Sequence, residues 1–249
     1  MQLVVSVLGY GDHPGLLARC LTGIWNASDL PEYVAQVRLF LNAPSARMLD
    51  TAQRMIPLSP VPVLLQSRRD NPGKYGRMRE AIYGVSGEYA PARAHADGFV
   101  WFDDDSFIRP QETAGFFGWV ATELEAHDLL GSTYHIPLGG HQADWIRQQP
   151  WYTGKPFMPH GHAWQQVEFL QGAFWAARLE CLERWQYPFP ELYHNGGDVM
   201  LGALAYQRDF RVRWHHKTPS QKVAINADEA GRESRAARRG LSTRPVGWE

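Results

Sequence analysis

One ten-residue stretch, from Gly98 to Phe107, constrains the fold more than any other part of the chain. It reads GFVWFDDDSF, in which four apolar or aromatic residues are followed by three consecutive aspartates. The apolar run predicts a short buried strand that places the acids at its carboxyl end. Ligands bind at such ends in open α/β sheets, and a divalent cation offsets the repulsion between neighbouring carboxylates. The stretch therefore predicts a cation or nucleotide site, and the alternative is a solvated acidic turn before a helix after Pro110.

Apolar runs alternate with helical patterns over the first half of the chain. Strands are predicted at Leu3–Leu8, Val37–Leu41 and Val61–Leu65. Helices are predicted after Pro14, from a cap at Ser45 to Met55, and over Arg77–Tyr83. Strands that alternate with helices indicate a mainly parallel, doubly wound sheet.

The second half is less regular. Helices are predicted at Glu112–Ala126, Arg178–Trp185 and Asp198–Tyr206, and strands at Leu130–Ile136, Val167–Trp175 and Phe210–Trp214. The connection from 137 to 166 is too long for a simple linker. Loops of this length are usually functional lids or disordered, and its five aromatic residues argue against disorder. The residues after the last strand are predicted to form a helix or a mobile tail.

Composition excludes several classes of protein. The two cysteines, Cys20 and Cys181, provide neither a disulfide framework nor a thiolate metal site. No apolar run approaches the ~20 residues of a membrane helix, and the first five residues lack the basic region of a signal peptide. We therefore expect a cytoplasmic protein without a membrane span, in the host cytoplasm if the source is viral. The sequence does not indicate an oligomeric state.

Four segments, one of them inside the Gly98–Phe107 stretch, occur in an order and at spacings that resemble the GT-A glycosyltransferases. They are Asn71–Arg77, Trp101–Asp105, Gly172–Trp175 and His194–Gly202. The first two are similar to family 2 members, and the aspartate triplet resembles that of the fringe-type enzymes. One departure is that Gly197 stands where the family usually has an acid before Asp198.

The resemblance implies an α/β fold of the GT-A (Rossmann-like) type, with a mixed, mainly parallel sheet flanked by helices. It implies a single domain over 1–249, with a nucleotide-sugar-binding half at about 1–110 and an acceptor half at about 111–217. A basic C-terminal tail would occupy about 218–249. The implied activity is metal-dependent, inverting transfer of a hexosyl or pentosyl group from a nucleotide diphosphate donor, with a UDP-sugar as the first choice.

The resemblance also assigns roles to individual residues. Metal binding, by Mn²⁺ or Mg²⁺, is assigned to Asp105 and to one of the pair His215 and His216. Donor binding is assigned to Tyr10, Asn42, Lys74, Arg77, Asp103 and Asp104. Asp198 would be the general base that accepts the proton of the acceptor hydroxyl. The simpler alternatives are solvated cations for Lys74 and Arg77 and a helix-dipole acid for Asp198.

Two other functions use the same acids. A nucleotidyltransferase or phosphohydrolase would also hold a metal and a nucleotide there, although residues 8–13 lack the glycine-rich phosphate loop of that fold. A sugar-binding relative without catalysis is the other alternative.

The acceptor is a carbohydrate or, less favoured, a hydroxylated base in phage-type DNA. The second acceptor rests on clustered basic residues, which are the electrostatic footprint of nucleic-acid binding. These are Arg68, Arg69, Lys74, Arg77, Arg79, Arg208, Arg211, Arg213, Lys217, Lys222, Arg232, Arg235, Arg238 and Arg239.

Overall fold

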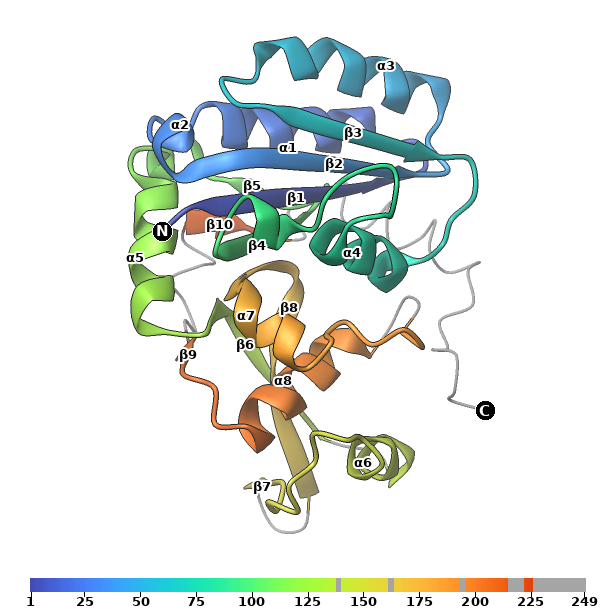
Figure 1. Ribbon diagram of the computed structural model, residues 1–249, viewed down its shortest axis with the longest axis vertical. Coiled ribbons are helices and arrows are strands. Elements are labelled where there is room, and N and C mark those ends of the chain that lie inside the picture. The colour runs from blue at the N-terminus through green and yellow to red at the C-terminus, as the bar shows by residue number, and fades with distance from the viewer. Residues whose placement is uncertain (138–139, 161–163, 193–195, 215–221, 226–249) are drawn as a thin grey trace.

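A computed structural model covers the chain and describes all residues except 138–139, 161–163, 193–195, 215–221 and 226–249. A mixed sheet of eight strands forms the centre of the described part (Figure 1). Its strands are β1 (Leu3–Tyr10), β2 (Val34–Asn42), β3 (Val63–Arg68), β4 (Gly98–Asp103), β6 (Leu129–Pro137), β7 (Met158–His160), β8 (Trp164–Arg178) and β9 (Val212–Trp214).

The strand order in the sheet is β3-β2-β1-β4-β8-β6-β9, and β7 pairs with β8. Strands β3, β2, β1 and β4 are mutually parallel, β8 runs antiparallel between β4 and β6, and β9 is parallel to β6. The predicted mixed, mainly parallel sheet is therefore confirmed. The carboxyl ends of β1, β2 and β4 lie side by side at one edge.

Both faces of the central strands β1 and β4 are buried, which explains why these two strands are almost entirely apolar. In β4, Phe99 and Trp101 pack into one core and Val100 and Phe102 pack into the other. Because successive side chains of a strand point to opposite faces, one apolar run supplies both cores.

Helices cover the two faces in separate layers. Helices α1 (Pro14–Trp25), α3 (Ala46–Met55) and α5 (Phe116–Ala126) contribute to one core, and α4 (Lys74–Tyr83), α7 (Leu179–Arg184) and α8 (Gly197–Gln207) contribute to the other. The remaining α-helices of the described part are α2 (Leu30–Tyr33) and α6 (Gly140–Arg147), and 3₁₀ turns lie at Ile56–Leu58, Ala92–Ala94 and Pro110–Glu112. None of the described helices combines the length and the apolar character needed to cross a membrane.

The structure corrects three details of the predicted elements. The helix expected from Glu112 begins at Phe116, because Gly115 takes a left-handed φ of 69° just before it. The long connection after residue 137 contains α6 and β7. Strand β10 (Val223–Ala224) pairs with β5 (Phe107–Ile108) in a second sheet, so the segment predicted as a helix or tail includes a strand.

Candidate active site

The acidic turn lies at the carboxyl end of β4, as predicted, and is tied to the end of β1. Leu8 is opposite Asp103 in the parallel register of the two strands. The backbone N–H of Asp104 donates to the Leu8 carbonyl at 3.0 Å, and the Tyr10 N–H donates to Asp104 Oδ2 at 3.3 Å. Backbone hydrogen bonds therefore set the position of the turn.

The three aspartates are buried, with 6%, 2% and 2% of Asp103, Asp104 and Asp105 exposed. The alternative of a solvated acidic turn is therefore wrong. Burial and then the charge of Asp104 raise the pKa of the Cys20 thiol well above its usual value, and Asp105 and Asp103 add smaller contributions of the same sign. The turn thus gathers three carboxyl groups inside the protein.

Lys74, the first residue of α4, lies against this acidic turn. Its Nζ donates to Asp103 Oδ2 at 2.7 Å and to the Gly172 carbonyl at 2.6 Å. The indole Nε1 of Trp101 donates to the other Asp103 oxygen at 3.0 Å. Gly73, with a φ of 86°, makes the turn that starts the helix here.

Asn42 supports that turn from the end of β2. Its Nδ2 donates to Asn71 Oδ1 at 3.1 Å and to the Gly73 carbonyl at 3.4 Å, and Asn71 Oδ1 also accepts the Gly73 N–H. Only 1% of Asn42 is exposed. This side chain lies behind the turn that carries Lys74, and its role toward a donor would be indirect. Tyr10, opposite Asn42 in the sheet, is partly exposed.

Asp198 reaches the same place from the other half of the molecule. It is in the first turn of α8, after Gly196 at a φ of 83°. A β-carbon on Gly172 would lie 3.6 Å from Asp198 Oδ2 and 3.2 Å from Lys74 Nζ, so the three residues meet. Burial raises the pKa of Asp198, while the charge of Lys74 lowers it, and the net direction is upward. A carboxylate with a raised pKa beside a cation suits proton transfer.

Arg77 is not brought to the acidic turn. Its guanidinium is buried, pairs with Glu80, donates to the Gln66 carbonyl at 3.0 Å and lies 4.5 Å from the Phe40 ring centroid. These contacts with α4, β2 and β3 give Arg77 a structural role away from the acidic turn.

Three groups of this site were missed by reasoning from sequence. They are the Gly172 carbonyl, the Tyr75 hydroxyl and the Tyr187 hydroxyl. A backbone carbonyl leaves no sequence signal, and a buried tyrosine resembles any core aromatic. Gly197 was a sequence signal that pointed to an unusual neighbour of Asp198, because it is where the chain departs from the family pattern.

The predicted metal ligands are only partly described. Asp105 is in the acidic turn, whereas His215 and His216 lie outside the described residues. Within the described part, no group of three His, Cys, Asp or Glu side chains is arranged to hold a metal. Carboxylate oxygens such as those of Asp105 are nevertheless the kind of ligand that a hard divalent cation prefers, and a bound diphosphate would supply further oxygens.

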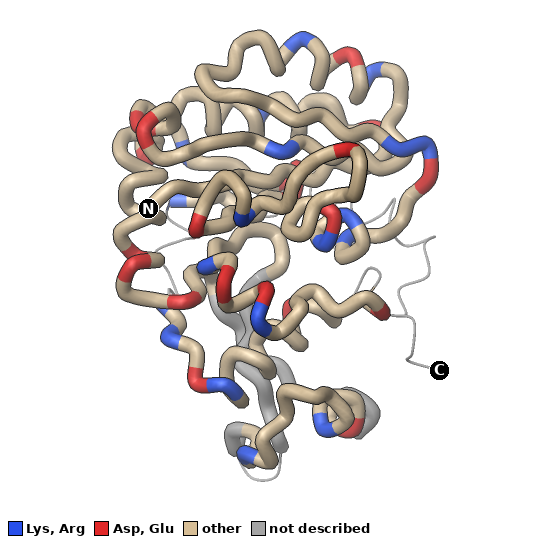
Figure 2. The backbone as a smooth tube through the Cα atoms, viewed as in Figure 1, with Lys and Arg blue, Asp and Glu red and all other residues tan. Residues whose placement is uncertain are grey.

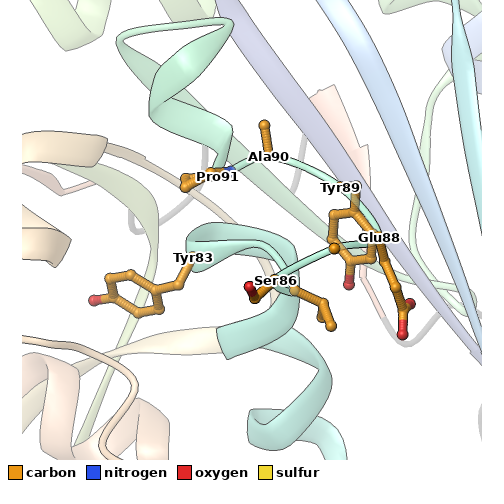
Figure 3. A pocket seen from close by; sticks show the side chains of 8 residues that line it. Tyr83, Ser86, Glu88, Tyr89, Ala90 and Pro91 are labelled. Atoms are coloured by element: carbon orange, nitrogen blue, oxygen red, sulfur yellow. The ribbon is translucent and has the colours of Figure 1, made fainter.

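A cavity of about 540 Å³ lies away from this site, beyond the carboxyl end of α4 (Figure 3). Tyr83, Ser86, Glu88, Tyr89, Ala90 and Pro91 line it, together with Val85 and Gly87. Lys74 is at the opposite end of the same helix, roughly 15 Å away for ten residues. None of the lining residues is a predicted site residue.

Basic residues do not form a continuous stripe on the described chain. Figure 2 shows Lys and Arg interspersed with Asp and Glu. Among the described residues of this predicted basic set, six make ion pairs: Arg68 with Asp70, Lys74 with Asp103, Arg77 with Glu80, Arg211 with Asp128, Arg213 with Glu123 and Lys222 with Glu112. Much of the predicted basic charge is therefore paired with carboxylates in the described part of the chain.

Solved structures share the fold of this chain, although no family model and no curated protein matches the sequence. The mannosyltransferase PcManGT from Pyrobaculum calidifontis, in complex with GDP-Man and Mn²⁺, aligns with 85% of the chain at a TM-score of 0.54 and 14% identity. S. aureus TarS 1–349 aligns with 87% at a TM-score of 0.52 and 13% identity, and its complex with UDP-GlcNAc aligns at 0.53 and 11% over 87%. The chain spans 54%, 58% and 56% of these three structures. The chain has the GT-A fold that its motifs predicted.

Proposed function

We propose that this protein transfers a sugar from a nucleotide diphosphate donor to a carbohydrate hydroxyl, with inversion at the anomeric carbon. The observation that carries the proposal is the position of Lys74. Its ammonium joins Asp103, at the end of β4, to the Gly172 carbonyl on β8, beside Asp198. A negative donor-side turn, a cation and a carboxylate with a raised pKa therefore meet at one point.

Each group has a role in the proposed reaction. Asp198 accepts the proton of the acceptor hydroxyl as the oxygen attacks the anomeric carbon. The bond from that carbon to the diphosphate oxygen breaks, and the diphosphate leaves with the electron pair. Attack opposite the leaving group inverts the configuration. Lys74 would offer a positive charge to the departing diphosphate, since an ammonium has three donors and the hydrogen bonds to Asp103 and Gly172 use two of them.

The donor is proposed to be a UDP-sugar. Asp103 and Asp104 would receive the ribose hydroxyls, and Tyr10 would border the base at the neighbouring strand end. Asp105 would hold Mn²⁺ or Mg²⁺ together with a histidine of the 215–216 pair. When bound, the cation supplies charge that stabilises the leaving diphosphate.

Calorimetry with a panel of UDP- and GDP-sugars, with Mn²⁺ and with EDTA, tests the proposal. We expect one donor to bind in a metal-dependent way and to release nucleoside diphosphate slowly by hydrolysis. Binding without any turnover would indicate a sugar-binding protein. Pyrophosphate release from a nucleoside triphosphate, with no use of nucleotide sugars, would replace the proposal with a nucleotidyltransferase.

A further inference from the structure

The residue before Asp198 has no room for a side chain. A β-carbon on Gly197 would lie 2.2 Å from Cε1 and Cζ of Tyr75 and 2.8 Å from Cδ1. Gly197 is the first residue of α8 and does not have a positive φ. Its backbone conformation would therefore accept a side chain, and the three atoms nearest to an added β-carbon all belong to the Tyr75 ring.

The Tyr75 hydroxyl holds one side of the peptide group that links Gly197 to Asp198. It accepts the Asp198 N–H at 3.1 Å. This N–H is one of the donors that a helix start leaves without a partner inside the helix. Tyr75 therefore both fills the side-chain volume at 197 and caps the N–H of residue 198.

The Tyr187 hydroxyl holds the other side of the same peptide group. It donates to the Gly197 carbonyl at 3.0 Å, and both phenols are buried. Because a peptide group is planar, holding its N–H and its C=O fixes the orientation of the plane and the start of the Asp198 side chain. Tyr75 comes from α4 and Tyr187 from the segment after α7, so two segments far apart in the sequence set one residue of α8.

We propose that Tyr75 and Tyr187 are positioning residues that clamp the Gly197–Asp198 peptide, and that residue 197 is glycine because the Tyr75 ring replaces a side chain there. In the resembling family an acid occupies this position. Here the first two residues of α4 serve Asp198 together: Tyr75 holds its backbone while Lys74 lies beside its carboxylate. The clamp is a feature of the fold, and its consequence for turnover rests on the proposed function.

The first test removes one hydroxyl. We expect Tyr75→Phe to lower kcat for donor hydrolysis roughly five- to fiftyfold, the effect of leaving one N–H without its partner, and to leave the donor KM within about twofold. Tyr206→Phe is the matched control, because Tyr206 is on the same helix as Asp198 and its hydroxyl donates to the Pro156 carbonyl at 2.9 Å. An equal loss of kcat in both variants, or a loss carried by KM, would overturn the positioning role.

The second test needs no substrate. Gly197→Ala should lower the urea midpoint in the wild type and in Tyr75→Phe, which keeps the ring, and should cost far less in Tyr75→Leu, which removes it. Tyr75→Met replaces the leucine background if that variant does not unfold cooperatively. Gly76→Ala is the control for a helical glycine with space, since the nearest atom to its added β-carbon is Pro72 Cβ at 3.8 Å.

The outcomes separate the two proposals. Equal costs of Gly197→Ala in all three backgrounds would refute the clamp, even in an active enzyme. A chain that shows the coupling but turns over no nucleotide sugar would refute the proposed function and leave the clamp as a structural feature.

Discussion

Replacing Lys74 by methionine should destabilise the protein and weaken its catalysis together. The Lys74 and Asp103 side chains are 15% and 8% exposed, and Nζ lies 2.7 Å from Oδ2. Removing one partner of a buried ion pair costs about 3–5 kcal/mol because the other charge remains buried. Partial exposure, and the hydrogen bond that Trp101 keeps to Asp103, reduce our expectation to about 2–3 kcal/mol.

Thermal and urea unfolding measure this cost. For a chain of this size about 2–3 kcal/mol corresponds to a fall in Tm of roughly 4–12 °C. Lys155→Met is the matched control, because Lys155 also contacts a carboxylate and a backbone carbonyl. Its Nζ donates to Asp209 Oδ1 at 2.6 Å and to the Tyr206 backbone carbonyl at 3.1 Å. That pair is 35% and 81% exposed, so its loss should cost about 0–1 kcal/mol.

The same variant should change the pH dependence of catalysis. Burial raises the pKa of Asp198 and the charge of Lys74 lowers it, so Lys74→Met should raise the pKa further. A general base works when deprotonated, and activity is lost as the pH falls through its pKa. The acid limb of kcat/KM should therefore move to higher pH in Lys74→Met and stay in place in Lys155→Met. An unshifted acid limb, or equal losses of stability in the two variants, would refute the reasoning.

Three further predictions concern the base, the metal and the acceptor. Asp198→Asn should cut kcat by about 10²–10⁴-fold with donor binding nearly unchanged. It should also raise stability at neutral pH, because a carboxyl whose folded pKa is raised stabilises the fold at low pH and loses that contribution as the pH rises through the folded pKa. Unfolding at pH 4 and pH 7 checks this, and an equal effect at both would contradict it. Asp105→Ala should abolish the Mn²⁺ dependence of UDP binding seen by calorimetry, and wild-type affinity that is unchanged in EDTA would rule out the metal. Duplex DNA should bind weakly, with no transfer to plain or hydroxymethylated duplexes; a steep fall of log affinity with log salt, together with transfer, would restore DNA as the acceptor.

Elements with a strong local signal were predictable. Strand β4 is a continuous apolar run, and its place at the centre of the sheet requires that pattern. The cap predicted at Ser45 is confirmed, since its side chain accepts the Met48 N–H at 3.1 Å. The pairing of β10 with β5 was not predictable, because two-residue strands more than a hundred positions apart have no periodicity to detect.

The sequence by itself determined which chemical groups stand at the strand ends. Three aspartates must follow β4, because the apolar run places that boundary locally. The helix predicted over Arg77–Tyr83 begins three residues earlier in the structure, at Lys74 after Gly73. The position of Asp198 at a helix start follows from the same kind of signal.

Only the tertiary structure decided which of these groups meet. Lys74 and Arg77 are both basic residues of α4, and their sequence context does not separate them. Lys74 is at the end of the helix and reaches past the strands to Asp103, whereas Arg77 is nearly one turn further in, over Phe40 and the Gln66 carbonyl. One turn advances the chain by about 5.4 Å, enough to move a cation from the edge of the sheet into the packed layer above it. The roles of the two cations therefore depend on how α4 lies across the sheet, which long-range packing sets.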